Sequence, residues 1–347
     1  MFLFKVDTTK GFIPRFQVVN SSQSLDRNSR SDFPFKIKPD ISIYRSDLPI
    51  ADMTDSSLAE IFIEFKWQPS DDPFCDVTDD QKFPKSFLRR SNAARDTLGQ
   101  ITSYAAAQLG SQFRTHIYSV FIVRDKARLL RWDRSGTIVT EAIEYNKSPF
   151  LVDFFRRYSK ALPKMCGQDQ SVSAVMPTEA DEARRALQLD NEIPLIKLAV
   201  PVTEQLSRYF ITCPPRAALY TPAGRATRGF CAYDISERKA VFLKDSWRID
   251  LKDIHPEGSI YEVLEHHQVP HVPHCLISGD ISTYQYHATK TSDYYYKSSW
   301  ACHSDAHFVP HRHYRLVLDI IGVPLTKFGS SYEMVTAIRD ALHGALP

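Results

Sequence analysis

The sequence predicts a protein of mixed α and β structure, organised in two blocks. Short stretches rich in β-branched and aromatic residues, typical of strands, alternate with stretches whose apolar residues recur every three or four positions, as in helices. A polar segment, residues 163–194, separates the two groups of strands and carries acidic and basic residues in short alternation, as a linker would. The length of 347 residues is that of roughly two domains of about 100–200 residues each.

Composition excludes several classes of protein. Hydrophobic residues make up 43% of the chain, which excludes bulk disorder. The net charge of +2 argues against a protein that acts mainly as a basic coat on nucleic acid, although a local basic groove stays open. No apolar run approaches the roughly 20 residues of a membrane span, so we expect no membrane contact. The six cysteines form no Cys-x-x-Cys pair, and we expect free thiols and an intracellular location, cytoplasmic or nuclear.

The first block, residues 1–165, is expected to contain five strands and two helices. The predicted strands are residues 37–44, 58–67, 114–124, 127–133 and 137–143. The predicted helices are residues 91–109 and 152–162.

We place the linker at residues 166–196, with one short helix near 179–187, and the second block at 197–347. Residues 281–312 are expected to be an insertion between the last two strands of that block. Its predicted strands are residues 229–234, 240–245, 274–278 and 314–319. Its predicted helices are residues 257–266 and a last one that begins near Tyr332.

Charged residues gather near two predicted strands of the first block. Glu64 and Lys66 are two positions apart on an apolar strand, so they point to the same side, and Asp40 follows Lys38-Pro39. A charge on such a strand is unfavourable unless it is paired or bound. Two carboxylates beside a lysine can hold Mg²⁺ and orient an attacking water at a phosphodiester.

Two further residues, Gln100 and Tyr104, share one face of the predicted helix because they are four positions apart. Together with Asp40 and with Glu64-Phe65-Lys66 they resemble the PD-(D/E)xK nuclease superfamily, including the Gln-x-x-x-Tyr element of its exonuclease-like branch, over about residues 35–145.

This resemblance implies a restriction-endonuclease-like α/β domain with nucleic acid as its substrate. By the same resemblance Asp40 and Glu64 would bind the metal, Lys66 would support the nucleophile, and Gln100 and Tyr104 would be accessory. An ordinary edge strand with a Glu–Lys pair is the alternative. A basic run before the helix could contact phosphates: Lys82, Lys85, Arg89, Arg90 and Arg95.

A lysine and a glutamate in the second block have the spacing of a phosphate-binding pair. Lys244 ends an apolar strand, and Glu257 begins a helical pattern thirteen residues later. In a protein kinase such an ion pair holds the ammonium against the α- and β-phosphates of ATP. A lysine at the end of a solvated strand is the alternative. The other candidate ATP-binding residues are Gly224 and Gly229 before the strand, and Leu318, Asp319 and Ile320 in a stretch typical of a fifth strand and hinge.

Longer phrases carry a more specific resemblance. LKDSWR at 243–248, PEGSIY at 256–261 and HYRLVL at 313–318 resemble the fungal-type protein kinase family, as do FRTH at 113–116 and LLRWDRSG at 129–136. The resemblance runs from about residue 35 to the end of the sequence. It implies a kinase-like N-lobe, an antiparallel sheet with one helix, followed by a hinge and the start of a helical lobe. It also implies ATP and Mg²⁺ as cofactors and transfer to Ser or Thr of a protein substrate in intact relatives.

The sequence departs from the kinase pattern in two ways. Phosphotransfer needs a catalytic Asp in a His-Arg-Asp-like loop and a metal-binding Asp before Phe-Gly, and neither motif follows the hinge. The phosphate loop from Gly224 to Gly229 keeps two glycines where kinases usually have three. We therefore expect a truncated, nucleotide-binding remnant of a kinase. A metal-dependent nuclease and a non-catalytic interaction module with an exposed apolar surface remain the alternatives.

A cluster of histidines precedes the last predicted strand. Zinc needs four ligands in tetrahedral geometry, and Pro310 interrupts any helix that would align them. We expect a histidine-rich surface loop, with zinc binding as the alternative. The cluster comprises Cys302, His303, His307, His311 and His313.

Overall fold

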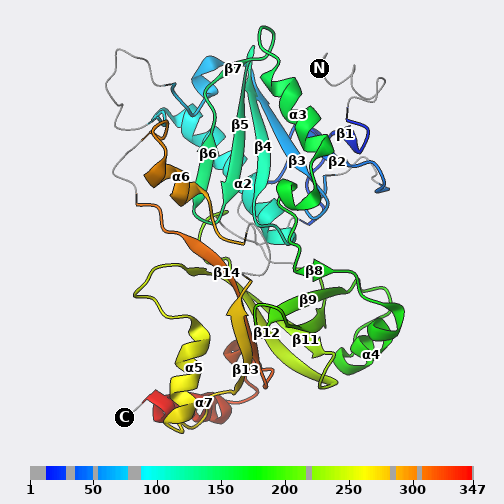
Figure 1. The fold of residues 1–347 in the computed structure, drawn as a ribbon, viewed down its shortest axis with the longest axis vertical. Coiled ribbons are helices and arrows are strands. Elements are labelled where there is room, and N and C mark those ends of the chain that lie inside the picture. The colour runs from blue at the N-terminus through cyan, green and yellow to red at the C-terminus, as the bar shows by residue number, and fades with distance from the viewer. Residues whose placement is uncertain are drawn as a thin grey trace. The chain divides into compact units, whose positions relative to one another are not determined.

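The computed structural model describes residues 13–28, 36–49, 54–76, 87–215, 221–281, 287–302 and 307–345. The chain divides into two compact units. The first unit contains residues 1–169, 215–226 and 288–311, and the second unit contains residues 170–214, 227–287 and 312–347. Each sheet has seven strands, which confirms the mixed α and β structure (Figure 1). Among the described residues, no helix combines the length and the apolar composition needed to cross a bilayer.

The sheet of the first unit combines antiparallel pairs with one parallel pair. Its first three strands form an antiparallel meander, and β3 then pairs in parallel with β4 because helix α2 (Asn92–Ser111) crosses between them. The strands are β1 (Phe16–Asn20), β2 (Ile41–Arg45), β3 (Ile61–Lys66), β4 (Ile117–Val123), β5 (Lys126–Asp133), β6 (Gly136–Val139) and β7 (Ile143–Glu144).

Strand β4 is buried on both faces, as its continuous apolar sequence predicts. Phe121 packs in a core with Ile101 of α2, whereas Val120 packs in a second core with Phe155 of helix α3 (Phe150–Lys160). The side chain of Ser91 caps the first turn of α2 by accepting a hydrogen bond from Ala94 N at 3.3 Å. The two helices therefore fix the position of β3, which neighbours β4 and carries Glu64 and Lys66.

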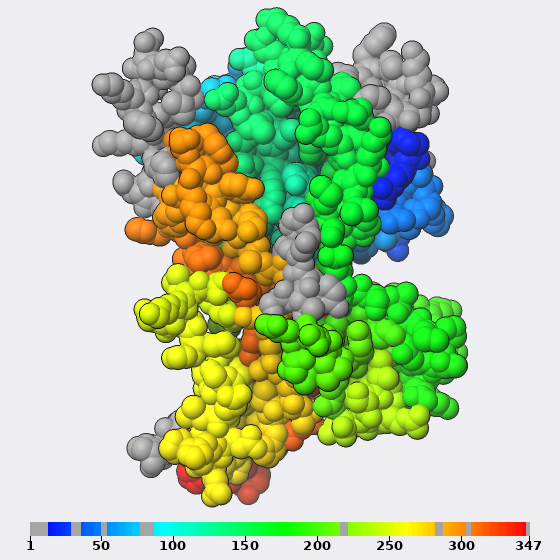
Figure 2. Space-filling model, in the orientation of Figure 1, coloured from blue at the N-terminus to red at the C-terminus, as the bar shows by residue number. Residues whose placement is uncertain are grey.

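Residues 288–311, predicted as part of an insertion, belong to the first unit. Their helix α6 (Thr291–Lys297) lies beside β6 in Figure 1 and forms part of the surface in Figure 2, where it is orange. The buried carboxylate of Asp133 holds this segment, because its Oδ2 accepts hydrogen bonds from the backbone amides of Lys290 at 2.8 Å and Thr291 at 3.0 Å.

The second unit is built around a sheet in the order β13-β14-β12-β11-β10-β9-β8. The helices are α4 (Pro177–Leu187), α5 (Glu257–His266) and α7 (Ser331–Ala345). The strands are β8 (Val172–Ser173), β9 (Ile196–Pro201), β10 (Ser207–Thr212), β11 (Arg228–Asp234), β12 (Lys239–Ile249), β13 (Cys275–Asp280) and β14 (His311–Leu318). In the described parts of both units, short 3-10 helices occur at Pro69–Asp71, Pro163–Cys166 and Leu325–Lys327.

Helix α4, predicted near residues 179–187, is confirmed and contributes to the core of the second unit. Its Ala183 packs against Ile211 of β10 and Tyr233 of β11. The sequence analysis did not predict β9 and β10, the two strands that precede β11. Their apolar side chains become buried only in the folded sheet: Ile211 packs under α4, and Leu198 lies opposite Phe210 of β10.

Candidate functional site

Strand β12 separates two chemically different faces of the second unit. Its side chains alternate, so Leu243 and Asp245 are buried on one face, while Phe242 and Lys244 point to the other. On the second of these faces, Phe242 of β12 and Tyr261 of α5 pack against the same core, which β14 forms with Tyr314, Leu316 and Leu318. Lys244 therefore faces the same side of the sheet as α5.

The ammonium of Lys244 is held by both carboxylate oxygens of Glu257, at 2.7 Å each. Glu257 is the first residue of α5, and each of the two side chains is 24% exposed. The pair therefore has good geometry and remains within reach of solvent. The sequence spacing predicted this contact.

Gly258 sets how closely α5 approaches the sheet. Its backbone amide donates a hydrogen bond to the hydroxyl of Tyr314 at 2.8 Å. A β-carbon at this position would lie 1.9 Å from Oγ of Ser278 and 2.6 Å from the Tyr314 hydroxyl. Only glycine allows this approach, and the approach places the neighbouring Glu257 opposite Lys244.

The opposite face of β12 carries a buried carboxylate that the sequence analysis did not single out. Asp245 Oδ1 accepts a hydrogen bond from Arg315 Nε at 2.8 Å, and Arg228 Nη2 lies 3.3 Å from Oδ2. His313 Nε2 lies 2.6 Å from Oδ1. Burial alone would raise the pKa of Asp245, but the charges of His313 and Arg315 hold that pKa well below its ordinary value. A charged residue at an inward position of an apolar strand was the available signal.

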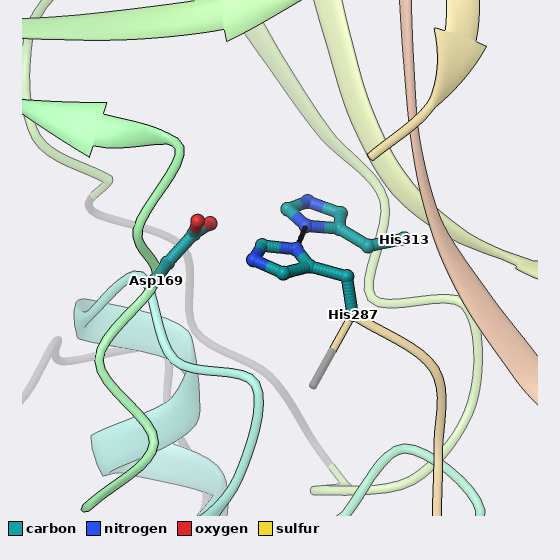
Figure 3. Close-up of side chains that lie close together, drawn as sticks. All are labelled: Asp169, His287 and His313. Atoms are coloured by element: carbon teal, nitrogen blue, oxygen red, sulfur yellow. Dashed lines mark hydrogen bonds between the residues drawn. The ribbon is translucent and has the colours of Figure 1, made fainter. Parts of the chain in front are cut away.

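Stacked rings extend this cluster away from Asp245. His313 lies between Trp247 and His287, with ring centroids 4.9 and 5.1 Å away and interplanar angles of 4°. Figure 3 shows the two imidazoles face to face, joined through their Nδ1 atoms at 2.9 Å. The predicted surface loop is therefore wrong for His311 and His313, because both are buried in β14. His303 lies outside the described residues.

The remaining predicted ATP-binding residues are distributed over both units. Gly229 pairs with Lys244 across β11 and β12. Gly224 belongs to the first unit, where its amide donates to the carbonyl of Arg134 at 2.8 Å and its φ is +99°.

At the predicted hinge, Leu318 is buried at the end of β14, and Ile320 is exposed. The backbone amide of Asp319 donates to the carbonyl of His274 at 3.1 Å, and Asp319 Oδ1 accepts from the amide of His274 at 2.9 Å. The hinge is thus tied to the chain that enters β13.

In the first unit the structure brings all five nuclease-like residues together. Lys66 Nζ donates to Glu64 Oε1 at 2.6 Å and to Gln100 Oε1 at 2.8 Å. Gln100 Nε2 donates to the hydroxyl of Tyr104 at 2.7 Å, and that hydroxyl donates to the carbonyl of Lys38 at 2.7 Å. Asp40 Oδ2 accepts the backbone amide of Phe65 at 2.8 Å, which fixes this carboxylate beside β3.

The carboxylate of Glu64 is the member of this group whose charge is least favourable. Burial raises its pKa, the bond from Lys66 offsets part of the rise, and the charge of Asp40 adds to it. Burial and the charge of Glu64 also raise the pKa of Tyr104, so the phenol is neutral. Glu64 Oε2 is buried, and none of the described residues hydrogen bonds to it. An orphaned carboxylate oxygen beside a second carboxylate fits a hard divalent cation such as Mg²⁺.

Comparison with known proteins adds one finding. The model of a family described as fungal protein kinase matches residues 85–346. No curated protein and no solved structure matches the chain. The matched region contains Lys244, Glu257 and their strand and helix, whereas Asp40, Glu64 and Lys66 precede it. The match covers most of the chain, which therefore belongs to the fungal protein kinase family.

Proposed function

We propose that the second unit binds the phosphates of ATP through Lys244, in the manner of the N-terminal lobe of a protein kinase. The observation that carries the proposal is the ion pair of Lys244 with both oxygens of Glu257 at 2.7 Å. In kinases the phosphate-binding lysine lies on the third strand and pairs with a glutamate of the following helix. Here β12 is the third of the strands β10, β11, β12, β14 and β13 in spatial order, and α5 follows it.

The chemistry of the pair suits a triphosphate. Because Lys244 is partly exposed, its ammonium can contact phosphate oxygens without leaving Glu257. Hydrogen bonds to a charged group are worth about 1.5–3 kcal/mol each. Mg²⁺, when bound with the nucleotide, neutralises phosphate charge. Gly229 of β11 lies opposite Lys244, and the ring of Phe242 packs directly against it, 2.7 Å from where a β-carbon would stand.

The proposal is limited to nucleotide binding. In intact relatives the family resemblance implies ATP-dependent transfer to Ser or Thr of a protein substrate. That step needs a catalytic and a metal-binding aspartate, and the 347 residues contain neither a His-Arg-Asp nor an Asp-Phe-Gly tripeptide. For these residues we therefore propose binding of the ATP phosphates and not the transfer step.

A melting experiment on the full chain tests this proposal. Saturating ATP with Mg²⁺ stabilises a protein that binds it by about 2.7 kcal/mol at 100 times the Kd, so the melting temperature should rise. Lys244→Met should abolish the rise. Lys239→Met, an exposed lysine on the same strand, should retain it. The proposal fails if ATP leaves the melting temperature unchanged, or if the two variants respond alike.

The orphaned Oε2 of Glu64 favours a second candidate function, metal-dependent cleavage of nucleic acid in the first unit. Asp40 and Glu64 would hold the cation and Lys66 would support the attacking water. Plasmid nicking in Mn²⁺ is the test: Lys66→Ala should abolish nicking, and Lys126→Ala, an exposed lysine of β5, should not. Nicking that survives Lys66→Ala contradicts this candidate.

Three further predictions from the sequence, on fold, domain boundaries and location, are also proposals. We propose a restriction-endonuclease-like fold for the first block. The domain boundaries 1–165 and 197–347 remain our proposal for the two blocks of sequence, although residues 215–226 and 288–311 of the second block belong to the first compact unit. We also propose an intracellular location, cytoplasmic or nuclear. The absence of any Cys-x-x-Cys pair among the six cysteines supports a reducing compartment.

A further inference from the structure

Two histidines and an aspartate of the second unit converge where α7 meets the loop after α5. His271 lies in that loop, and Asp340 and His343 are three residues apart on α7, hence on one face of the helix. One ligand atom of each residue, an imidazole nitrogen or a carboxylate oxygen, lies within 4.8 Å of the other two. Residues distant in sequence thus form a compact set of nitrogen and oxygen ligands.

The packing of α7 creates this juxtaposition. A β-carbon on Gly344 would lie 2.9 Å from the carbonyl oxygen of Pro270, so α7 can approach the loop only because this residue has no side chain. Figures 1 and 2 both show α7, in red, beside the end of α5, in yellow. His343 precedes Gly344 and is thereby brought to His271.

The backbone of the loop is restricted around His271. His271 has φ +62°, in the left-handed region that only a few residue types adopt readily. Prolines at positions 270 and 273 restrict the backbone on either side of it. A rigid loop loses less entropy when its side chain binds, so this geometry favours ligand binding.

The carboxylate of Asp340 has one oxygen to offer, because Arg339 occupies only the other one. Arg339 donates from Nε at 3.0 Å and from Nη2 at 2.8 Å, and both bonds go to Oδ1. Oδ2 lies on the same carboxylate and can face the histidines.

We propose that His271, Asp340 and His343 bind a divalent first-row transition-metal ion, with Zn²⁺ as the tested ion and water completing the coordination. Two imidazoles and one carboxylate suit Zn²⁺ and its neighbours, whereas Mg²⁺ and Ca²⁺ prefer oxygen ligands alone. Tetrahedral Zn²⁺ with bonds of about 2.0–2.1 Å needs its ligand atoms roughly 3.3 Å apart. Small rotations of the two exposed histidines close the remaining distance.

The bound ion would link the loop after α5 to the last turns of α7. Glu257, at the opposite end of α5, keeps its own partner Lys244, so the metal site is separate from the proposed nucleotide site. Metal binding at this site is therefore independent of ATP binding.

Titration calorimetry of the full chain with Zn²⁺ alone tests the site. We expect the wild type to bind one Zn²⁺. His255→Ala, which changes an exposed histidine outside the cluster, should bind it equally well. His271→Ala and His343→Ala should bind it at least roughly tenfold more weakly. Asp340→Asn should weaken binding as well. All variants should melt like the wild type in the presence of a chelator, since the three side chains lie at or near the surface.

Co²⁺ absorption distinguishes binding at this site from binding to cysteine thiols. A histidine and carboxylate site gives ligand-field bands without thiolate-to-metal charge transfer, and these bands should disappear in His343→Ala. The proposal is overturned if the wild type binds no Zn²⁺, if His271→Ala and His343→Ala bind it as His255→Ala does, or if the Co²⁺ spectrum is dominated by thiolate charge transfer.

Discussion

Each unit of the molecule sets a lysine against a glutamate, but the two pairs differ in burial. The side chains of Lys244 and Glu257 are both 24% exposed, and both oxygens of the glutamate contact the ammonium. Lys66 is 25% exposed, whereas Glu64 is 4% exposed and uses one oxygen only. Lys244 and Glu257 are therefore equally exposed and fully paired, whereas Glu64 is far more buried than Lys66 and is only half paired.

The difference shows where each unit carries an unfavourable charge. A partly solvated pair such as Lys244–Glu257 contributes little to stability and leaves the lysine available to an anion. Glu64 has lost its hydration, and Lys66 compensates for only part of that loss. Such a carboxylate is typical of a site that a cation completes. In the second unit the buried charge lies on the other face of β12, at Asp245, where it is surrounded by cationic partners.

The largest expected loss of stability comes from the buried face of β12, at Asp245. Asp245→Asn leaves Arg228 and Arg315 buried without their carboxylate, and removing one partner of a buried pair costs about 3–5 kcal/mol. Asp250→Asn is the matched control, because Asp250 pairs with Arg312 near the surface and such pairs are worth about 0–1 kcal/mol. Urea unfolding followed by circular dichroism measures both. Equal losses in the two variants would contradict the structural role of Asp245.

An intermediate effect is expected where α5 meets the sheet. Gly258→Ala introduces a β-carbon into the contact with Ser278 and Tyr314, and overpacking of this kind costs about 1–3 kcal/mol. Because Glu257 moves with the helix, nucleotide binding should weaken too. Gly99→Ala on α2, where nothing lies within 4 Å of a β-carbon, should instead stabilise by about 0.5–1 kcal/mol. Thermal unfolding of the two variants should therefore shift in opposite directions.

The sequence predicted contacts that depend on spacing within or between neighbouring elements. Lys244 and Glu257 lie on a strand and on the helix that follows it, so their spacing and the kinase pattern sufficed. Gln100 and Tyr104 share a helix face, as their spacing predicted, and hydrogen bond to each other, while Gln100 also accepts from Lys66.

Contacts that depend on tertiary packing could not be predicted in this way. Gly224 and Gly229 are five residues apart, yet they belong to different units, and no local pattern distinguishes them. The approach of Asp340 and His343 to His271 requires the packing of α7 against a loop about 70 residues earlier in the chain. The buried partners of Asp245 likewise come from two other strands, β11 and β14, that only the sheet brings beside β12.

The smallest expected effect sharpens the description of Glu64. Burial raises its folded pKa above the ordinary value of 4.5, so the protonated form is favoured in the folded state. Its contribution to stability is thus present below pH 4.5 and is lost as the pH rises through the folded pKa. Glu64→Gln should therefore gain stability relative to the wild type as the pH rises from 4.5 toward 7. Urea unfolding at several pH values measures this, and a difference independent of pH would contradict it.

The most direct test of the account compares the two lysines in one binding experiment. Calorimetric titration of the full chain with ATP and Mg²⁺ should show binding by the wild type. Lys244→Met should bind ATP roughly 10- to 100-fold more weakly, because it loses hydrogen bonds to a charged group that are worth about 1.5–3 kcal/mol. Lys66→Met should bind ATP as the wild type does. Weakened binding by Lys66→Met with unchanged binding by Lys244→Met, or no binding by the wild type, would contradict the assignment of the nucleotide site to the second unit.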